Sequence, residues 1–335
     1  MSINKLLSID EIQELFAILK TKKIAVIGDF CLDAYWFIDH SCQSHSLETG
    51  LSITNVKKQK YSLGGAANVV NNLKSLGLGD VDAYGVIGDD PFGNELLQQL
   101  KIIDCNTSNL CIQNVSWDTH AYSKPILQNK EINRFDFGIS NDLLEQTETK
   151  LLGSIKKNIN KYDMIIVNQQ IKNGLHQKSF PKRLQEIISQ TNTICDCRDK
   201  EIEYSSTYLK INKVEALEKG LLLEINEDQK VIRKMIDDGI YQNIFVSLGS
   251  EGCLVFGKEE KFEIPVPFKL KGLDPVGGGD SLLSGISVGL IGQWDVVKSA
   301  ALGCLVASVT VQKNYQTGTA TPEEIMTALE QNTIN

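Results

Sequence analysis

The chain has 335 residues, of which 42% are hydrophobic and 23% are charged. This is the composition of an ordinary globular protein, and it excludes a wholly disordered chain and a collagen-like or low-complexity scaffold. The 34 Lys and Arg residues against 42 Asp and Glu residues give a net charge of −8. Because binding to nucleic-acid phosphates requires a basic surface, we expect no nucleic-acid partner.

The N-terminal segment is acidic and amphipathic. Ser8 and Glu11 have the spacing of a helix capping box, and apolar residues follow at helical spacing. A signal peptide would have an unbroken apolar core after a basic start, so we expect a cytoplasmic protein. The most apolar later stretches, 281–294 and 299–311, are too short to span a membrane, and we expect no membrane partner.

Short apolar runs alternate with helix-period segments along most of the chain. Buried strands are predicted at 24–29, 81–88, 163–168, 193–196, 208–212, 243–249 and 252–257. Helices are predicted at 91–100, 143–158 and 227–238, and a last helix begins at Thr321. This alternation predicts an α/β fold with a mainly parallel sheet that is covered by helices on both faces. Such sheets bind ligands at the carboxyl ends of their strands.

Two segments, about 34–62 and 118–137, break the alternation. They are rich in aromatic, β-branched and charged residues, and they predict strands without intervening helices. These strands would form a small β insert that stands off the main sheet. The insert is either a lid over a site or a loose surface hairpin, and the residues alone favour neither.

The eight cysteines include no CxxC pair, and several lie inside apolar runs. Small buried side chains in a reducing compartment explain them better than a disulfide framework or a zinc site. Cys195 and Cys197 have the spacing of one strand face, which allows either a thiol pair or simple burial.

The sharpest local pattern is the segment from Asp274 to Asp280, DPVGGGD, which leads into an apolar helix. Gly277, Gly278 and Gly279 allow several backbone N–H groups to converge, and the helix N-terminus that follows favours an anion. A carboxylate at Asp280 beside a phosphate-binding turn is placed to accept a proton from a hydroxyl that attacks the phosphate. On its own, the pattern also fits a glycine loop with a capping Asp.

Three weaker patterns accompany it. Gly64 and Gly65 precede Asn68 at a small-residue turn that leads into a helix. The pair Asn212 and Glu215, which follows a strand, offers oxygen atoms to Mg²⁺ through water. The residues Ser247, Gly249 and Gly252 form a third small-residue turn. Each pattern taken singly is more often a turn or a helix cap.

The combination GGAAN, N-x-x-E, S-L-G-x-x-G and D-x-V-G-G-G-D, in this order, resembles the ribokinase-like (PfkB) family of sugar kinases. The resemblance implies one kinase domain over residues 1–335, with a three-layer α/β/α fold and the insert as lid and homodimer interface. It implies ATP and Mg²⁺, and allows a monovalent cation. By resemblance, Asp280 is the base and Gly277, Gly278 and Gly279 form the anion hole. The resemblance assigns Asn212 and Glu215 to Mg²⁺ and ATP phosphates, Ser247, Gly249, Gly252 and Asp274 to the nucleotide, and Asp33, Gly64, Gly65 and Asn68 to the sugar.

Within this family, GDFCLDAYW, NRFDFG and TGTATPEEI are similar to the heptose 7-phosphate kinases of lipopolysaccharide precursor synthesis. Those enzymes phosphorylate the anomeric hydroxyl, here of D-glycero-β-D-manno-heptose 7-phosphate, and Arg134 is a candidate contact for the substrate's phosphate. The chain departs from that branch at 168–174 and 196–198, on the substrate side, and it has Gly278 where the family usually has Ala.

Other small-molecule acceptors stay open: ribose, fructose 6-phosphate, 2-keto-3-deoxygluconate or a nucleoside. A different alternative is a non-catalytic homologue that senses a sugar or nucleotide. The intact set of Asp280, Asn212, Glu215 and the glycines argues against it. A dinucleotide-dependent dehydrogenase is disfavoured because no GxGxxG follows the first strand.

Overall fold

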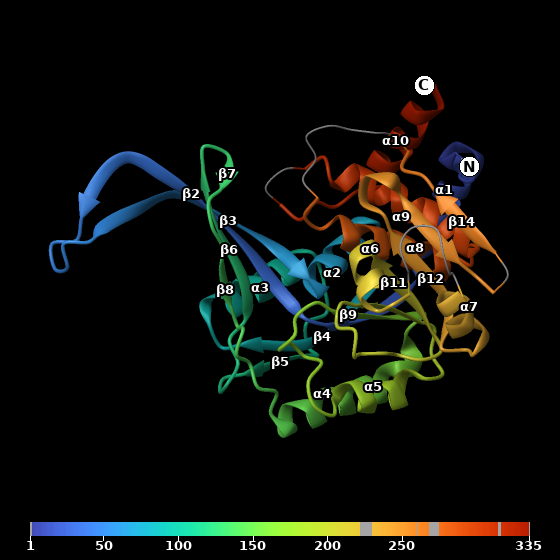
Figure 1. The fold of residues 1–335 in the computed structure, drawn as a ribbon, viewed down its shortest axis with the longest axis horizontal. Helices are drawn as coiled ribbons and strands as arrows, with labels where there is room; N and C mark the ends of the chain where they lie inside the picture. Colours follow the sequence, from blue (N-terminus) through green and yellow to red (C-terminus); the bar gives the residue numbers. More distant parts are fainter. Residues whose placement is uncertain (1, 222–229, 259, 268–274, 314–315, 335) are drawn as a thin grey trace.

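The structure is a computed structural model that describes residues 2–221, 230–258, 260–267, 275–313 and 316–334. A nine-stranded sheet forms its centre, in the order β14-β13-β12-β11-β10-β9-β1-β4-β5 (Figure 1). Neighbouring strands from β12 to β5 pair in parallel, whereas β13 and β14 are antiparallel. The strand bounds are β1 Lys23–Gly28, β4 Asp80–Gly88, β5 Leu110–Gln113, β9 Met164–Gln169, β10 Thr193–Cys197, β11 Thr207–Asn212, β12 Tyr241–Ser247, β13 Cys253–Phe256 and β14 Lys261–Ile264.

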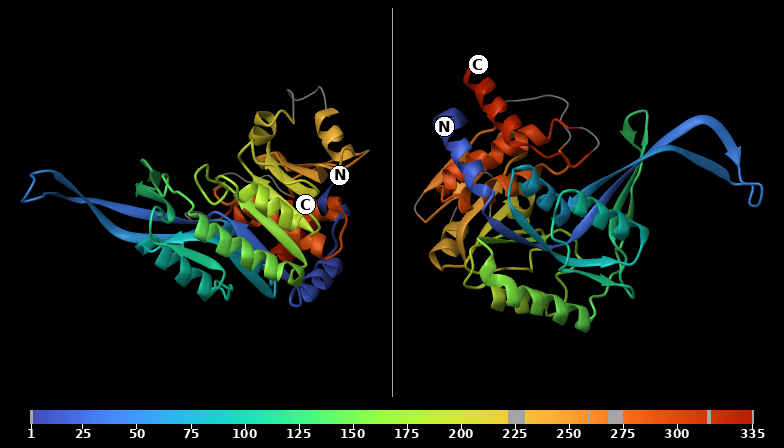
Figure 2. Two further views of the ribbon diagram at one scale, coloured as in Figure 1. Left: turned by 90° about the horizontal axis from the view of Figure 1, so that it is seen from below. Right: turned by 180° about the vertical axis from the view of Figure 1, so that it is seen from behind.

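Helices cover both faces of this sheet, because alternate residues of each buried strand point to opposite faces. Val26 and Ile166 pack in one apolar cluster, and their neighbours Ile27 and Val167 pack in the other. The first cluster includes residues of α1 Ile9–Leu19, α2 Ala66–Ser75, α3 Pro91–Ile102, α8 Gly278–Ile291, α9 Val296–Thr310 and α10 Pro322–Ile334. The second includes residues of α4 Glu145–Asn158, α5 Phe180–Ile188, α6 Lys213–Glu218 and α7 Lys230–Asp237. Figure 2 shows these layers from two further sides, which confirms the three-layer α/β/α architecture.

A second, smaller sheet has the order β3-β2-β6-β7, with β8 paired to β6. Its strands are β2 Phe30–His45, β3 Ser52–Gly65, β6 His120–Leu127, β7 Lys130–Glu131 and β8 Phe135–Phe137. The long β2–β3 hairpin extends away from the main body (Figures 1 and 2). Both segments expected to form the insert lie in this sheet, and β2 begins directly after the end of β1.

Local sequence signals place the starts of two helices correctly. The capping box of Ser8 and Glu11 is present at α1, and Thr321 with Glu324 makes the same reciprocal bonds before α10. The structure extends the predicted helix 91–100 to Ile102. The expected helix 227–238 is seen as α7 from Lys230, and its first residues lie outside the described part of the chain.

Several elements were not predicted from the sequence: β5, β14, α5, α6 and α9. The two strands are only four residues long, and they form the two edges of the main sheet, where the apolar run that marks a buried strand is absent. The cysteines whose side chains are described, Cys195 and Cys197 among them, are buried and free of disulfides. None of the described helices is long and apolar enough to cross a membrane.

Candidate active site

Asp280 lies in the first turn of α8, at the carboxyl ends of the parallel strands. Its side chain is buried, with the residue 8% exposed. The amide Nδ2 of Asn68 donates to Asp280 Oδ2 at 2.8 Å, and the amide Nε2 of Gln170 donates to Oδ1 at 2.9 Å. The carboxylate is therefore held from two sides, by α2 and by the segment after β9.

Burial raises the pKa of Asp280 to about 6, and nearby Asp196 adds to this rise. The hydrogen bond from Asn68 and the charges of Lys210 and Arg198 act in the opposite direction. At neutral pH the carboxylate is mostly ionised, yet it is more basic than an exposed Asp. This combination suits a group that accepts a proton near neutral pH.

The glycine turn wraps the N-terminus of α8. Gly277 has φ +81°, in the left-handed region that favours glycine, and a Cβ there would lie 2.8 Å from Asn68 Nδ2. A Cβ on Gly279 would lie 3.1 Å from the ammonium Nζ of Lys210. The absence of side chains lets a ligand approach the backbone of this turn beside a cation, an arrangement that can bind a phosphoryl group. The N–H of Gly278 itself donates to Pro275 O at 3.1 Å.

Lys210 forms a buried ion pair with Asp196, with 2.8 Å between Nζ and Oδ2. Both side chains are less than 10% exposed. Burial alone would lower the pKa of Lys210, but the charge and hydrogen bond of Asp196 hold it above the ordinary value. The ammonium is therefore a permanent positive charge directly against the glycine turn.

Asn212 and Glu215 make a reciprocal capping box at the start of α6. Glu215 N donates to Asn212 Oδ1 at 2.9 Å, and Asn212 N donates to Glu215 Oε2 at 2.8 Å. The other carboxylate oxygen, Oε1, lies 3.7 Å from Arg198 Nε. Within the described residues, no group of three His, Cys, Asp or Glu side chains converges on a metal site. The donor set fits Mg²⁺ held through water and phosphate oxygens, which needs only one or two carboxylates.

The remaining residues that were expected to bind the nucleotide follow β12, the strand next to β11 in the main sheet. Ser247 ends β12 beside Asn212 of β11, and its hydroxyl donates to Ile211 O at 3.4 Å. Gly249 and Gly252 both have positive φ values, and a Cβ on Gly252 would lie 2.0 Å from Ile264 O. The turn therefore requires glycine at position 252 for a structural reason. Asp274 lies outside the described residues.

On the acceptor side, Asp33 of β2 is buried and pairs with Lys124 of β6, with 2.5 Å between Asp33 Oδ1 and Lys124 Nζ. Gly64 faces this carboxylate, because a Cβ there would lie 2.8 Å from Asp33 Oδ2. Gly65 precedes α2 with φ +54°. The hinge glycines and Asp33 are thus brought together.

Arg134 lies in the smaller sheet region, between β7 and β8. Its guanidinium forms hydrogen bonds with both carboxylate oxygens of Asp136 and stacks over the ring of Tyr122. The side chain is half exposed. The structure therefore gives Arg134 an ion-pair partner two residues away, on the neighbouring strand β8.

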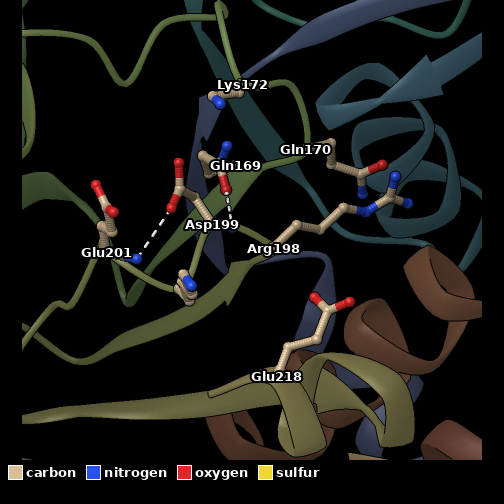
Figure 3. A pocket seen from close by; sticks show the side chains of 8 residues that line it. Gln169, Gln170, Lys172, Arg198, Asp199, Glu201 and Glu218 are labelled. Carbon is tan, nitrogen blue, oxygen red and sulfur yellow. Dashed lines mark hydrogen bonds between the residues drawn. The ribbon is translucent and has the colours of Figure 1, made fainter.

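A cavity of about 600 Å³, lined by polar and charged side chains, opens beside Gln170 (Figure 3). Gln170 lines it and also donates to Asp280, which is not itself a lining residue, so one side chain separates the cavity from the carboxylate. Figure 3 shows the Arg198 side chain extending toward Gln170. The lining residues are Gln169, Gln170, Lys172, Arg198, Asp199, Lys200, Glu201 and Glu218.

The segment that carries Gln170 is fixed by Asp29, which directly follows β1. The Asp29 carboxylate accepts hydrogen bonds from the backbone N–H groups of Gln170, Ile171 and Leu175 at 2.7–3.0 Å. Burial raises the pKa of Asp29 to about 6 despite these donors. Asp29 thus fixes the backbone of the segment that carries the lining residue Gln170.

Sequence reasoning missed several residues at this site: Gln170, Lys210, Lys124 and Asp29. The signal for Lys210 was present, because a lysine between Leu209 and Ile211 in a buried strand needs a charged partner. Gln170 and Lys124 act through contacts with residues far away in the sequence, which leave no local pattern.

Residues 21–324 match the family model described as pfkB family carbohydrate kinase. The chain is 32% identical over 316 residues to Bifunctional protein HldE of Aliarcobacter butzleri, and the match covers 91% of this chain. The chain spans 64% of that relative, which is less than two thirds of its length.

Solved structures show the same fold. The tetrameric inhibited form of phosphofructokinase-2 from Escherichia coli has a TM-score of 0.71 at 16% identity, over 93% of this chain and 99% of that one. An E. coli protein assigned as ribokinase II, in complex with ATP and Mg²⁺, has a TM-score of 0.70 at 14% identity, over 92% and 99%. The family match extends over the whole site described above, and the chain belongs to the pfkB family of carbohydrate kinases.

Proposed function

We propose that this kinase transfers the γ-phosphate of ATP to the anomeric hydroxyl of a sugar that already carries a phosphate, of the D-glycero-β-D-manno-heptose 7-phosphate type. The observation that carries the proposal is the buried Asp280 carboxylate, held by two amides beside a glycine turn and a buried cation. Similarity to the HldE relative supports the choice of substrate class.

In the proposed reaction, Asp280 accepts the proton of the attacking sugar hydroxyl. The hydrogen bonds from Asn68 and Gln170 orient the carboxylate and stabilise its ionised form. The backbone N–H groups of Gly277 and Gly279 and the ammonium of Lys210 stabilise the negative charge on the phosphoryl oxygens. The N–H of Gly278 would join them only by leaving Pro275 O, to which it donates at 3.1 Å. Catalysis then rests mainly on positioning and electrostatics.

Asn212 and Glu215 are the residues that would hold Mg²⁺ with the ATP phosphates, in agreement with their place beside Lys210 on β11 and α6. Bound Mg²⁺ supplies charge neutralisation on the phosphates. Ser247, Gly249, Gly252 and Asp274 would bind the nucleotide. A monovalent cation stays an expectation from the resemblance alone.

The cavity supports a phosphorylated acceptor. The wall carries three cations, Lys172, Arg198 and Lys200, together with three carboxylates, Asp199, Glu201 and Glu218. The lining therefore has no net positive charge, and the proposal requires the cations to face the phosphate. A second phosphate needs such a cluster, because a lone exposed cation binds it weakly in water. Asp33, Gly64, Gly65 and Asn68 would contact the sugar, and Arg134 would contribute only if it leaves Asp136.

The experiment that tests the proposed function measures ATP consumption by the purified protein with Mg²⁺. The acceptor panel contains heptose 7-phosphate, fructose 6-phosphate, ribose, 2-keto-3-deoxygluconate and nucleosides. We expect the highest kcat/KM with heptose 7-phosphate. A higher kcat/KM with an unphosphorylated acceptor would overturn the substrate class, and ATP binding without turnover on any acceptor would favour a sensor.

Charge reversal at Lys172 is expected to weaken binding of the phosphorylated acceptor. In the Lys172→Glu variant, KM for the sugar phosphate should rise about tenfold or more, because one charge-assisted contact is replaced by repulsion. KM for ATP should change little. The matched control is Lys150→Glu, an exposed lysine of α4 that does not line the cavity. An unchanged sugar-phosphate KM in Lys172→Glu would remove this residue from the acceptor site.

We also propose that the β2–β3 hairpin mediates a homodimer. Large apolar side chains on it are exposed in the single chain: Leu47, Leu51, Ile53 and Val56. Long exposed strands with apolar side chains favour pairing with another chain. The variant Ile53→Lys should shift the mass measured by light scattering from two chains to one. The control Ile102→Lys, on an exposed position of α3, should leave the mass unchanged. A wild-type protein with the mass of one chain would contradict the dimer.

A further inference from the structure

A chain of buried polar side chains connects α2 to α8 behind Asp280. Asn68 and Asn72 lie one turn apart on α2, and both are fully buried. Asn72 Nδ2 donates to Asn68 Oδ1 at 3.1 Å and to the backbone carbonyl of Asn68 at 2.9 Å. On the other side, the Ser281 hydroxyl lies 2.9 Å from Asn72 Oδ1 and 3.0 Å from Gly277 O, so its one proton is shared between these two acceptors. Ser281 directly follows Asp280, so the chain of contacts returns to the residue beside the carboxylate.

These contacts fix the orientation of both amides. A backbone carbonyl only accepts hydrogen bonds, so the Asn72 atom that faces Asn68 O must be the donor Nδ2. The Asn68 atom that faces the same Nδ2 must then be the acceptor Oδ1. The other end of the Asn68 amide, the donor Nδ2, is left to point at Asp280. Asn72 therefore keeps the Asn68 amide from turning over.

We propose that Asn72 is a positioning residue for the phosphoryl transfer: it fixes the amide of Asn68 so that Asn68 donates to, and orients, the carboxylate of Asp280. The inference rests on the proposed role of Asp280 as proton acceptor. Asn72 acts on that carboxylate through Asn68. Ser281 supports it by holding the opposite end of the Asn72 amide.

The hydrogen bond from Asn68 also stabilises the ionised carboxylate, since it lowers the pKa of Asp280. The other charges that act on Asp280 are Asp196 of β10, Lys210 of β11 and Arg198 after β10. Substitutions on α2 leave all three in place. If the Asn68 amide turns over, its oxygen faces the carboxylate, and the protonated form of Asp280 is favoured.

The test is a double-mutant cycle on kcat with Asn68→Ala and Asn72→Leu, in the full chain with saturating ATP and acceptor. Leu is close to Asn in shape and makes no side-chain hydrogen bonds. Alone, Asn72→Leu should lower kcat about tenfold, the effect of one hydrogen bond to a charged group. In the Asn68→Ala background the same change should lower kcat less than about twofold, because its effect passes through the Asn68 amide.

The control is Asn71→Leu, the neighbouring, partly exposed position on α2, which should retain the wild-type kcat. A second readout is the acid limb of the kcat–pH profile, which should move to higher pH in Asn72→Leu and not in Asn71→Leu. If Asn72→Leu fails to fold, Asn72→Ser takes its place, because the shorter side chain also loses the contact with Asn68 Oδ1.

Multiplicative effects of the two substitutions on kcat, or an unshifted acid limb, would overturn the positioning role. Asp280→Asn separates this failure from failure of the proposed function. If Asp280→Asn abolishes turnover while the cycle is multiplicative, only the inference about Asn72 fails. If Asp280→Asn retains turnover, the proposed base is wrong.

Discussion

Replacement of Asp280 by Asn is expected to lower kcat by between about 10² and 10⁴-fold, the usual contribution of a general base. The amide cannot accept the hydroxyl proton. Binding of ATP should persist, because the glycine turn and Lys210 are unchanged. The measurement is a steady-state kcat with saturating substrates, together with calorimetric titration of ATP.

The Asp280→Asn substitution should leave the fold intact. The oxygen of the introduced amide can still accept from Asn68, and the Gln170 amide can turn over so that its own oxygen accepts from the introduced amide nitrogen.

In the wild type, kcat/KM should fall below pH about 6, since protonated Asp280 cannot act as a base.

The matched control is Asp295→Asn, which exchanges a carboxylate for an amide at the N-cap of α9, outside the glycine turn. Asn caps helices as well as Asp does, so stability and kcat should be close to wild type. A kcat within a fewfold of wild type in Asp280→Asn would show that another group accepts the proton.

The second large effect is expected at Lys210. The Lys210→Met variant leaves Asp196 buried without its partner, and this should cost about 3–5 kcal/mol of the free energy of unfolding. It also removes the cation beside Gly279, which should lower kcat by about 10²-fold or more, as for one electrostatic group at a transition state. Chemical denaturation and steady-state kinetics measure the two effects separately.

The double variant Lys210→Met with Asp196→Leu separates stability from catalysis. It replaces the buried pair with apolar side chains, so the free energy of unfolding should return close to that of the wild type. The kcat should stay low, because the cation is still missing. Recovery of both quantities in the double variant would mean that Lys210 acts only in folding.

The central layers of the fold follow from the sequence because parallel strands buried on both faces leave nearly continuous apolar runs. Strands β1, β4, β9, β10 and β11 appear within two residues of their predicted bounds. The edge strands β5 and β14 leave no such run, and were not predicted. The three-layer class needed only the central strands and the helices between them, so it was predicted correctly despite these omissions.

The site was predictable where its functional residues are neighbours in the sequence. Asp280 and the glycines before it are one contiguous segment, and the structure places them at a single helix N-terminus. Gln170 was not predictable, because its amide meets Asp280 across 110 residues of sequence. Asn68 was expected to contact the sugar, and its observed bond to Asp280 depends on how α2 packs against α8.

The measurement that tests the proposed phosphoryl transfer most directly is a phosphorus NMR analysis of the products from ATP and heptose 7-phosphate. We expect ADP and a new sugar phosphate on the anomeric carbon with the wild-type protein, and the same product formed at least about 10²-fold more slowly with Asp280→Asn. Release of inorganic phosphate without a phosphorylated sugar, or the same product at the same rate with Asp280→Asn, would contradict the proposed reaction.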